Sequence, residues 1–147
     1  MGISNHELHD KDFYAWTKET AQLLKKGKVS EVDIMNIAEE LEDMGISNKR
    51  ALISCFSILV SHLLKWKFQK ERRGKSWQLT IKGQRLKVKD LLHDSPSLKH
   101  DIELKLGMAY IDARLIAEKE TGLDIETFPE NCPFTLEDCL NEEFWPD

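Results

Sequence analysis

The sequence predicts an all-α fold: a single-domain antiparallel bundle of five to six helices over residues 1–147, with an irregular C-terminal arm. Three observations support this prediction. Apolar residues recur at intervals of three and four along most of the chain, which is the period of a helix with one buried face. Glycines and prolines separate these stretches, and capping residues stand at their starts. No segment keeps the alternating pattern of a β-strand, which excludes a sheet.

The first two expected helices lie in the first third of the chain. Asp10 or Asp12 can cap the first of them, and Gly27 is expected to end it. The second is expected to begin after Ser30, because an acid three residues further on completes a pattern that resembles a capping box. Gly45 is expected to end this helix and to turn the chain back on itself.

The third expected helix is the most apolar part of the chain. Ser47 is expected to cap it, and it runs to about Gln69. Its apolar face consists of two neighbouring stripes, Leu52, Cys55, Leu59, His62 and Trp66 in one and Ile53, Phe56, Val60 and Leu63 in the other. A helix that is apolar on most sides is usually enclosed by other helices. We therefore expect it at the centre of the bundle.

Two further helices follow, each with its own start signal. Ser76 is expected to cap the fourth helix. Ser95 has a proline directly after it, and this pair is expected to start the fifth helix, which ends before Gly122. Connections this short favour antiparallel neighbours.

The end of the chain is predicted to be an irregular arm. Residues 123–134 contain two prolines, and Thr135 is expected to cap one last short helix. Phe144 and Trp145 follow that helix. Because two large aromatic side chains are costly to expose, we expect them to pack back onto the bundle.

Short sequence motifs along nearly the whole chain form one recognisable set. They are Asp12-Phe13-Tyr14-Ala15-Trp16, the run from Asn36 to Gly45, His62-Leu63-Leu64-Lys65-Trp66, Ser76-Trp77, Thr80-Ile81, Gln84-Arg85, Ser95-Pro96-Ser97-Leu98, Ala109-Tyr110, Phe128-Pro129 and Cys132-Pro133. In this order they resemble the domain of unknown function family numbered twenty-nine, which is common in cyanobacteria. The resemblance implies a compact helical bacterial protein. It brings no established activity, ligand or catalytic residue.

The composition excludes several classes of protein. The chain has three cysteines and no CxxC pair, so neither a disulfide framework nor a zinc knuckle is indicated, and the reduced thiols of a cytoplasmic protein are expected. We expect no secretory signal, because no basic region with a following apolar stretch opens the sequence. The longest uncharged run, from Ala51 to Leu64, is shorter than the roughly 20 residues of a membrane span, so no membrane association is expected. The net charge of −5 argues weakly against general affinity for nucleic acid.

An acidic cluster lies on the second expected helix. Glu39, Glu42 and Asp43 are weak candidates for metal ligands, because carboxylates three or four residues apart on a helix can share an ion. Helical di-metal sites also use a histidine at such a spacing, and none stands three or four residues from these acids or from Glu40. The favoured interpretation is therefore a solvated face with ion pairs and no metal.

His62 is the one histidine on the apolar stripe of the third expected helix. A hairpin at Gly45 would place Glu40 opposite Leu52, and His62 would then lie some 15 Å further along the axis, at about 1.5 Å per residue. The acidic cluster is therefore not expected to include it. Across the next turn His62 is expected to face Gln84, and a direct or water-bridged hydrogen bond between these two buried polar groups would fix the helix register.

A basic segment covers residues 65–89. It contains ten Lys or Arg residues and one acid, Glu71, in a chain whose net charge is −5. Six of its residues are predicted to form an anion-binding surface, in which arginine forks grip phosphate and an aromatic ring stacks on bases: Arg72, Arg73, Lys75, Trp77, Lys82 and Arg85. The other interpretation is that these charges pair with acids inside the bundle or between subunits.

Three functions remain open from the sequence. The first is a non-enzymatic helical module that binds nucleic acid or an acidic protein through residues 65–89, including the acidic face of a second copy in a homo-oligomer. The alternative is a small hydrolase or nuclease in which His62 acts as acid or base while Arg73 or Arg85 holds phosphate. The third is a structural or regulatory subunit of a complex. No cofactor is expected.

Overall fold

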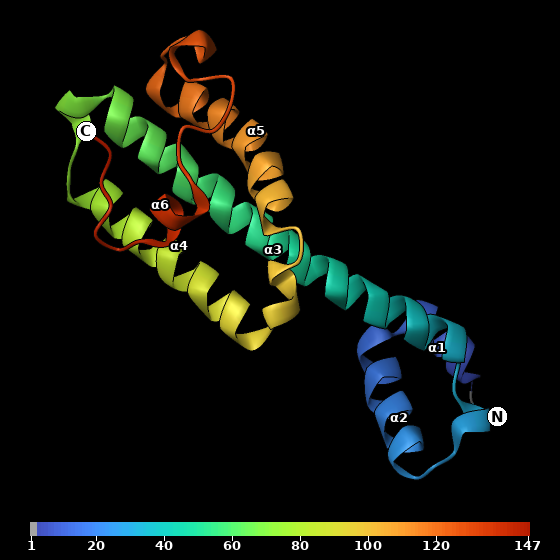
Figure 1. Cartoon of the computed structure of the whole chain (residues 1–147). Coiled ribbons are helices and arrows are strands. Elements are labelled where there is room, and N and C mark those ends of the chain that lie inside the picture. Colours follow the sequence, from blue (N-terminus) through green and yellow to red (C-terminus); the bar gives the residue numbers. More distant parts are fainter. Residues whose placement is uncertain (1–2) are drawn as a thin grey trace. The chain divides into compact units, whose positions relative to one another are not determined.

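The computed structural model describes residues 3–147, and every regular element in them is helical (Figure 1). The six α-helices are α1 (Asn5–Lys11), α2 (Phe13–Lys25), α3 (Ile34–Phe68), α4 (Lys75–Asp94), α5 (Ile102–Thr121) and α6 (Leu136–Leu140). Short 3-10 turns occur at Val29–Glu31, Lys70–Arg72, Pro96–Lys99 and Ile125–Thr127. The contacts group the chain into two compact units that share α3, one up to Ser47 and one from Asn48 onward. The all-α prediction is confirmed.

The second and third expected helices are one continuous helix, α3, so the predicted break was wrong. Gly45 has no positive φ and lies inside the helix, and Ser47 does not cap a new one. The start also differs, because Asp33 rather than Ser30 caps the helix: its Oδ1 accepts the backbone N–H of Asn36 at 3.2 Å. An interior glycine costs a helix only about 1 kcal/mol relative to alanine, which helix-forming residues on both sides can offset.

Replacing Gly45 with alanine is expected to stabilise the protein by about 0.5–1 kcal/mol. A Cβ at Gly45 would meet no atom within 4 Å, so the gain in helix propensity has no steric cost. Gly122 has a φ of 75°, and the same substitution there should destabilise by about 1–2 kcal/mol. Urea unfolding followed by circular dichroism measures both changes. A loss of stability at Gly45 would instead indicate a helix end at that residue.

The unit up to Ser47 consists of α1, α2 and the first turns of α3. Asp12 caps α2, as predicted, by accepting the N–H of Ala15 at 3.1 Å. Trp16 is buried, and its indole N–H donates to Oδ1 of Asn5 at 3.2 Å. The same oxygen accepts the backbone N–H of Asp33 at 2.9 Å. One asparagine of α1 therefore joins α2 to the start of α3.

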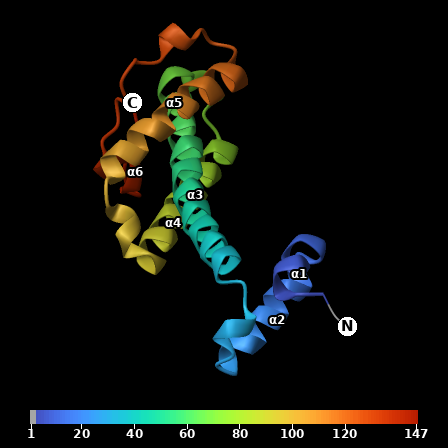
Figure 2. The same cartoon turned by 90° about the vertical axis from the view of Figure 1, so that its right-hand side faces the viewer.

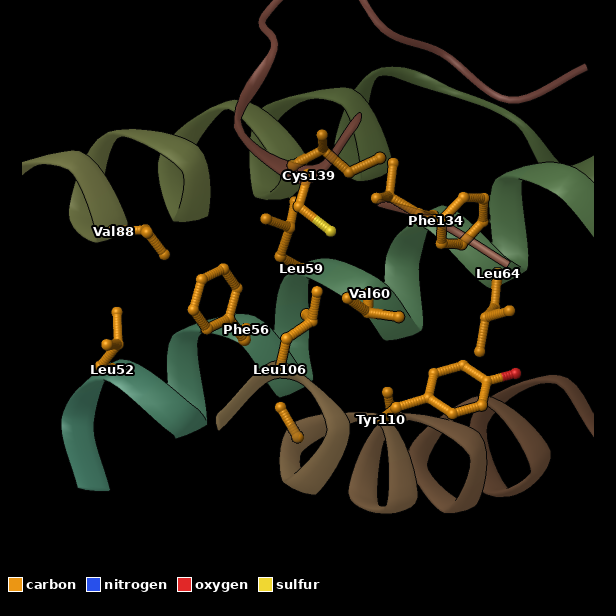
Figure 3. Packing of buried hydrophobic residues seen from close by; sticks show 14 of the residues in the cluster. Leu52, Phe56, Leu59, Val60, Leu64, Val88, Leu106, Tyr110, Phe134 and Cys139 are labelled. Atoms are coloured by element: carbon orange, nitrogen blue, oxygen red, sulfur yellow. The ribbon is translucent and has the colours of Figure 1, made fainter. Parts of the chain in front are cut away.

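In the unit from Asn48 onward, α3 packs between α4 and α5 (Figure 1, Figure 2). Its inward residues have no exposed surface: Leu52, Phe56, Leu59, Val60, Leu63 and Leu64. Figure 3 shows Phe56 beside Val88 of α4 and Leu59 beside Cys139 of α6, with Leu106 of α5 on the other side of α3. The expectation of a central helix is confirmed.

By length and composition α3 could also cross a membrane, and within residues 3–147 it is the one helix that could. Half of its most apolar stretch is buried inside the protein, as in the core helix of many water-soluble domains. The expectation that the chain has no membrane span stays a prediction.

The starts of α4 and α5 differ from the expected positions. Gly74 precedes α4 in place of Ser76, and no side chain caps that helix. Ser95 starts only a 3-10 turn, and Asp101, with a φ of 52°, then redirects the chain before α5 begins at Ile102. Proline after serine favours the first turn of any helix but does not determine how far it continues.

The C-terminal arm packs as predicted. Its last helix, α6, begins with a complete capping box formed by Thr135 and Asp138. The ring of Trp145 lies 4.8 Å from that of Trp66 on α3. The ring of Phe144 lies 6.0 Å from that of Phe134, within the arm. Both terminal aromatic residues contact the core cluster, which confirms that they dock.

Candidate interaction surface

Arg85, predicted to bind an anion, is one of the most buried side chains and is 1% exposed. Its Nε donates to the carbonyl oxygen of Cys139 at 2.9 Å. Its Nη2 donates to the carbonyl oxygens of Asp138 at 3.1 Å and Phe144 at 2.9 Å. Its guanidinium lies 5.6 Å from the ring centre of Trp145, and burial lowers its pKa. Arg85 therefore anchors the C-terminal arm to α4.

Arg73 has a similar role close by, at the last residues of the arm. Its Nε donates to the carbonyl oxygen of Trp66 at 2.6 Å, and its Nη2 to that of Pro146 at 3.0 Å. Its guanidinium also lies 5.1 Å from the ring centre of Trp66. Carbonyl groups of an irregular segment have no helical or sheet partner, so they need such donors. The two arginines are thus already bound to the protein's own backbone.

The aromatic residues of the basic segment are half-buried and contact other side chains. Trp77 is half-buried, and Nζ of Lys65 lies 5.7 Å from its ring centre. Lys65 is itself 5% exposed and forms an ion pair with Glu120 of α5. Phe68 packs edge to face against Phe128 of the arm at 5.6 Å. Stacking of bases needs an open ring face, and Phe68 is used in packing while Lys65 lies over the ring of Trp77.

Exposed lysines and leucines alternate along one side of α4, and we call this surface the α4 face: Lys75, Leu79, Lys82, Leu86 and Lys89. The lysines are spaced seven apart, and so are the leucines, which places all five on one side of the helix. Leu79 is 57% exposed and Leu86 is 59% exposed. Lys89 donates to Glu142 at 2.9 Å at one end of the face, and Arg72 is exposed in the turn before the other end.

A groove of about 560 Å³ borders the α4 face. Lys82 and Leu86 form its α4 side, and Glu142 and Trp145 of the arm lie opposite. The two leucines of the α4 face were not among the predicted binding residues, because the basic segment was defined by its charges alone. Their seven-residue spacing was the signal that could have identified them.

His62 does not form the predicted contact with Gln84. Its Nδ1 donates to the carbonyl oxygen of Ile58, one turn earlier in α3, at 2.9 Å. Over residues 3–147, Oε1 of Gln84 is buried and has no hydrogen-bond partner. Burial, more than any other cause, lowers the pKa of His62. The direct hydrogen bond does not form, because a helical imidazole can satisfy its own N–H within the helix.

No hydrogen bond or ion pair in the described part of the chain links His62 to the two arginines of the hydrolase alternative. The guanidinium groups of Arg73 and Arg85 are directed to the arm instead. The predicted anion-binding residues therefore separate into two sets. Arg73, Arg85 and Trp77 take part in internal packing, while Arg72, Lys75 and Lys82 face outward.

The acidic residues of α3 also have a role that the sequence did not reveal. Glu39, Glu42 and Asp43 are exposed, and in residues 3–147 no three metal-binding side chains gather at one point. Glu40 instead accepts a hydrogen bond from Nε2 of His9 at 2.8 Å, which raises the pKa of that histidine. His9 lies on α1, far from Glu40 in the sequence, so the helical spacing of three or four residues does not reveal this contact.

The three cysteines are thiols without a disulfide. Cys139 lies in the core, and burial raises its pKa to about 12. Burial also raises the pKa of Cys55 and of Cys132. Because the thiolate is the reactive form, none of the three is activated as a nucleophile.

Comparison with known proteins gives one match. A family model described as "Domain of unknown function DUF29" matches residues 8–145, which is nearly the whole chain. No curated protein and no solved structure matches the chain. The match covers both compact units, including the α4 face and the arm that Arg85 anchors. The chain therefore belongs to the family described as Domain of unknown function DUF29.

Proposed function

We propose that this chain is a protein-interaction module whose α4 face binds an acidic amphipathic helix of a partner protein. The observation that carries this proposal is the regular alternation of lysine and exposed leucine along one side of α4. Leu79 and Leu86 would contact the apolar stripe of the partner helix. Lys75 and Lys82 would pair with acids beside that stripe, as in other helix-in-groove complexes.

The same features argue for protein rather than nucleic acid as the partner. Nucleic-acid surfaces combine arginine forks with open aromatic rings, whereas here Arg73 and Arg85 bind the protein's own backbone and Trp77 is half-buried beside Lys65. Exposed leucines contribute nothing to phosphate binding, and apolar contact with a partner is the usual reason for a row of them. The net charge of −5 also opposes general polyanion binding.

The test measures binding of a fluorescent synthetic peptide helix with leucine on one face and glutamate beside it. Replacing Lys75 and Lys82 with glutamate should weaken binding at least about tenfold, since like charges then face each other. Replacing Leu79 and Leu86 with serine should weaken it as much. Lys87→Glu is the matched control, because Lys87 is exposed on α4 but lies outside the face.

The lysine variants and the leucine variants together distinguish a protein partner from a nucleic-acid partner. A protein partner requires both the lysines and the leucines, and single-stranded RNA or heparin requires only the lysines. If the protein is retained on heparin at low salt, if Leu79→Ser and Leu86→Ser do not reduce this retention, and if the unaltered protein does not bind the peptide, nucleic acid is the favoured partner. Equal peptide binding by all variants would contradict the role of the α4 face.

A further inference from the structure

A second exposed apolar surface runs along the outer side of α5. Leu104 is 65% exposed, Met108 45%, Ile111 65% and Leu115 51%. Their spacing of four, three and four residues is that of a coiled-coil seam. The opposite side of the same helix is already buried in the core, through Leu106, Ala109, Tyr110, Ala113 and Ala117. A helix that is apolar on both sides is usually covered on both sides.

The stripe continues into a groove between α3 and α5. The groove has a volume of about 550 Å³ and is lined mainly by apolar side chains, among them Ile53 and Ile58 of α3 and Met108, Leu115 and Ile116 of α5. The stripe and the groove together form one apolar patch, which we call the α5 patch. Such a continuous patch is larger than the scattered exposed side chains of an ordinary surface.

Two charged residues also line the groove, Arg50 of α3 and Asp112 of α5. Neither has an ion pair in the residues that the structure describes. They lie towards opposite ends of the groove, because α3 and α5 run in parallel there: Ser57 donates to Ala109, and Lys65 pairs further along with Glu120. Arg50 is therefore at the end of the patch nearer Leu104.

We propose that the α5 patch binds a second copy of this chain, with the two α5 helices antiparallel about a two-fold axis between Ala109 and Tyr110. Leu104 then faces Leu115 of the second copy, and Met108 faces Ile111. The reversed pairs form at the other side of the axis, so all four side chains of the stripe are covered by one symmetric contact.

The charges in the α5 patch favour a second copy of the chain over a partner whose surface is purely acidic or purely basic. The patch has one cation and one anion, so it is complementary to itself rather than to an acidic or a basic surface. When the two α5 helices are antiparallel, Arg50 of one copy lies at the Leu115 end of the patch of the second copy. There it is about one helical turn from Asp112 of the second copy, so the opposite charges attract. A parallel pair would instead place Arg50 beside Arg50.

Gly107 supports a close approach of another helix. It is exposed within α5, beside the stripe, and a Cβ there would meet no atom of this chain within 4 Å. An interior glycine costs a helix about 1 kcal/mol relative to alanine, and nothing inside this chain requires it. Glycine does allow the backbone of a partner to come near.

The test is the molar mass of the full chain, measured by light scattering during size-exclusion chromatography. The unaltered protein is expected to run as a dimer of the 17.1 kDa chain. Ile111→Glu should give a folded monomer, because it places two like charges in the seam. Leu86→Glu is the matched control, since Leu86 is 59% exposed on α4, and it should leave the dimer intact. Circular dichroism verifies that both variants are folded.

A charge exchange tests the antiparallel arrangement. Arg50→Glu and Asp112→Arg should each raise the dimer dissociation constant about tenfold, and the double variant should restore it. An unaltered protein that is monomeric at about 100 µM would overturn the proposal, since a two-sided apolar seam should hold a micromolar dimer. A dimer that survives Ile111→Glu would overturn it as well. Neither result bears on the α4 face, which lies on another helix.

Discussion

Arg85→Ala should lower the free energy of unfolding by about 3–5 kcal/mol. The substitution removes three hydrogen bonds at once and leaves the carbonyl oxygens of Asp138, Cys139 and Phe144 without their donor. Each unsatisfied buried carbonyl costs about 1–3 kcal/mol, part of which water recovers as the arm loosens. Urea unfolding followed by tryptophan fluorescence measures the loss.

A matched pair of variants separates the anchoring role of Arg85 from its charge. Lys87→Ala removes an exposed cation from the same helix and should change stability by less than about 0.5 kcal/mol. Arg85→Lys keeps the charge but cannot donate to three carbonyls in a fork, so it should recover only part of the loss. Limited proteolysis should cut the arm of Arg85→Ala first. If Arg85→Ala were as stable as Lys87→Ala, the arm would have to be held by its aromatic contacts alone.

Phe128→Ala should destabilise the protein by about 3–5 kcal/mol, although Phe128 lies in an irregular segment. The side chain is 1% exposed and packs edge to face on Phe68 of α3 at 5.6 Å. Its carbonyl oxygen accepts a hydrogen bond from Nη2 of Arg114 at 3.0 Å, and this bond holds the backbone around Phe128 in place. Truncation therefore leaves a cavity that the fixed backbone cannot readily fill.

Phe13→Ala is the control for Phe128→Ala, because Phe13 is 50% exposed and the same atoms are removed. We expect a loss of about 1 kcal/mol or less there. Chemical denaturation of both variants gives the comparison. Similar small losses at both positions would mean that the arm is not part of the core.

The helical periods of the sequence predicted most of the fold. The apolar stripes of α3 identified the central helix, and Gly122 and Thr135 marked a helix end and a helix start correctly. These features are local, since a cap or an apolar stripe is decided within one or two turns. The predicted helix boundaries failed at Ser30, Gly45, Ser76 and Ser95. At each of these residues a local start or stop signal is overridden by the conformation that the flanking residues adopt.

The candidate site was only partly predictable, for a different reason. A count of charges along residues 65–89 cannot tell a solvated lysine from an arginine that caps a carbonyl group. Arg85 donates to residues 53 to 59 positions away, and His9 reaches Glu40 across 31 positions. Contacts over such separations depend on how the helices pack, so no spacing rule reports them.

The sequence by itself thus determined the helical class, the central helix, the irregular arm and the family resemblance. Only the tertiary structure decided which charges are free. Burying a guanidinium is favourable only where several carbonyl oxygens converge on it, and that convergence exists at Arg85 only because the arm folds back over α4. Lys75, Leu79, Lys82 and Leu86 stay exposed on α4, and two of them, Lys82 and Leu86, border the arm across a groove.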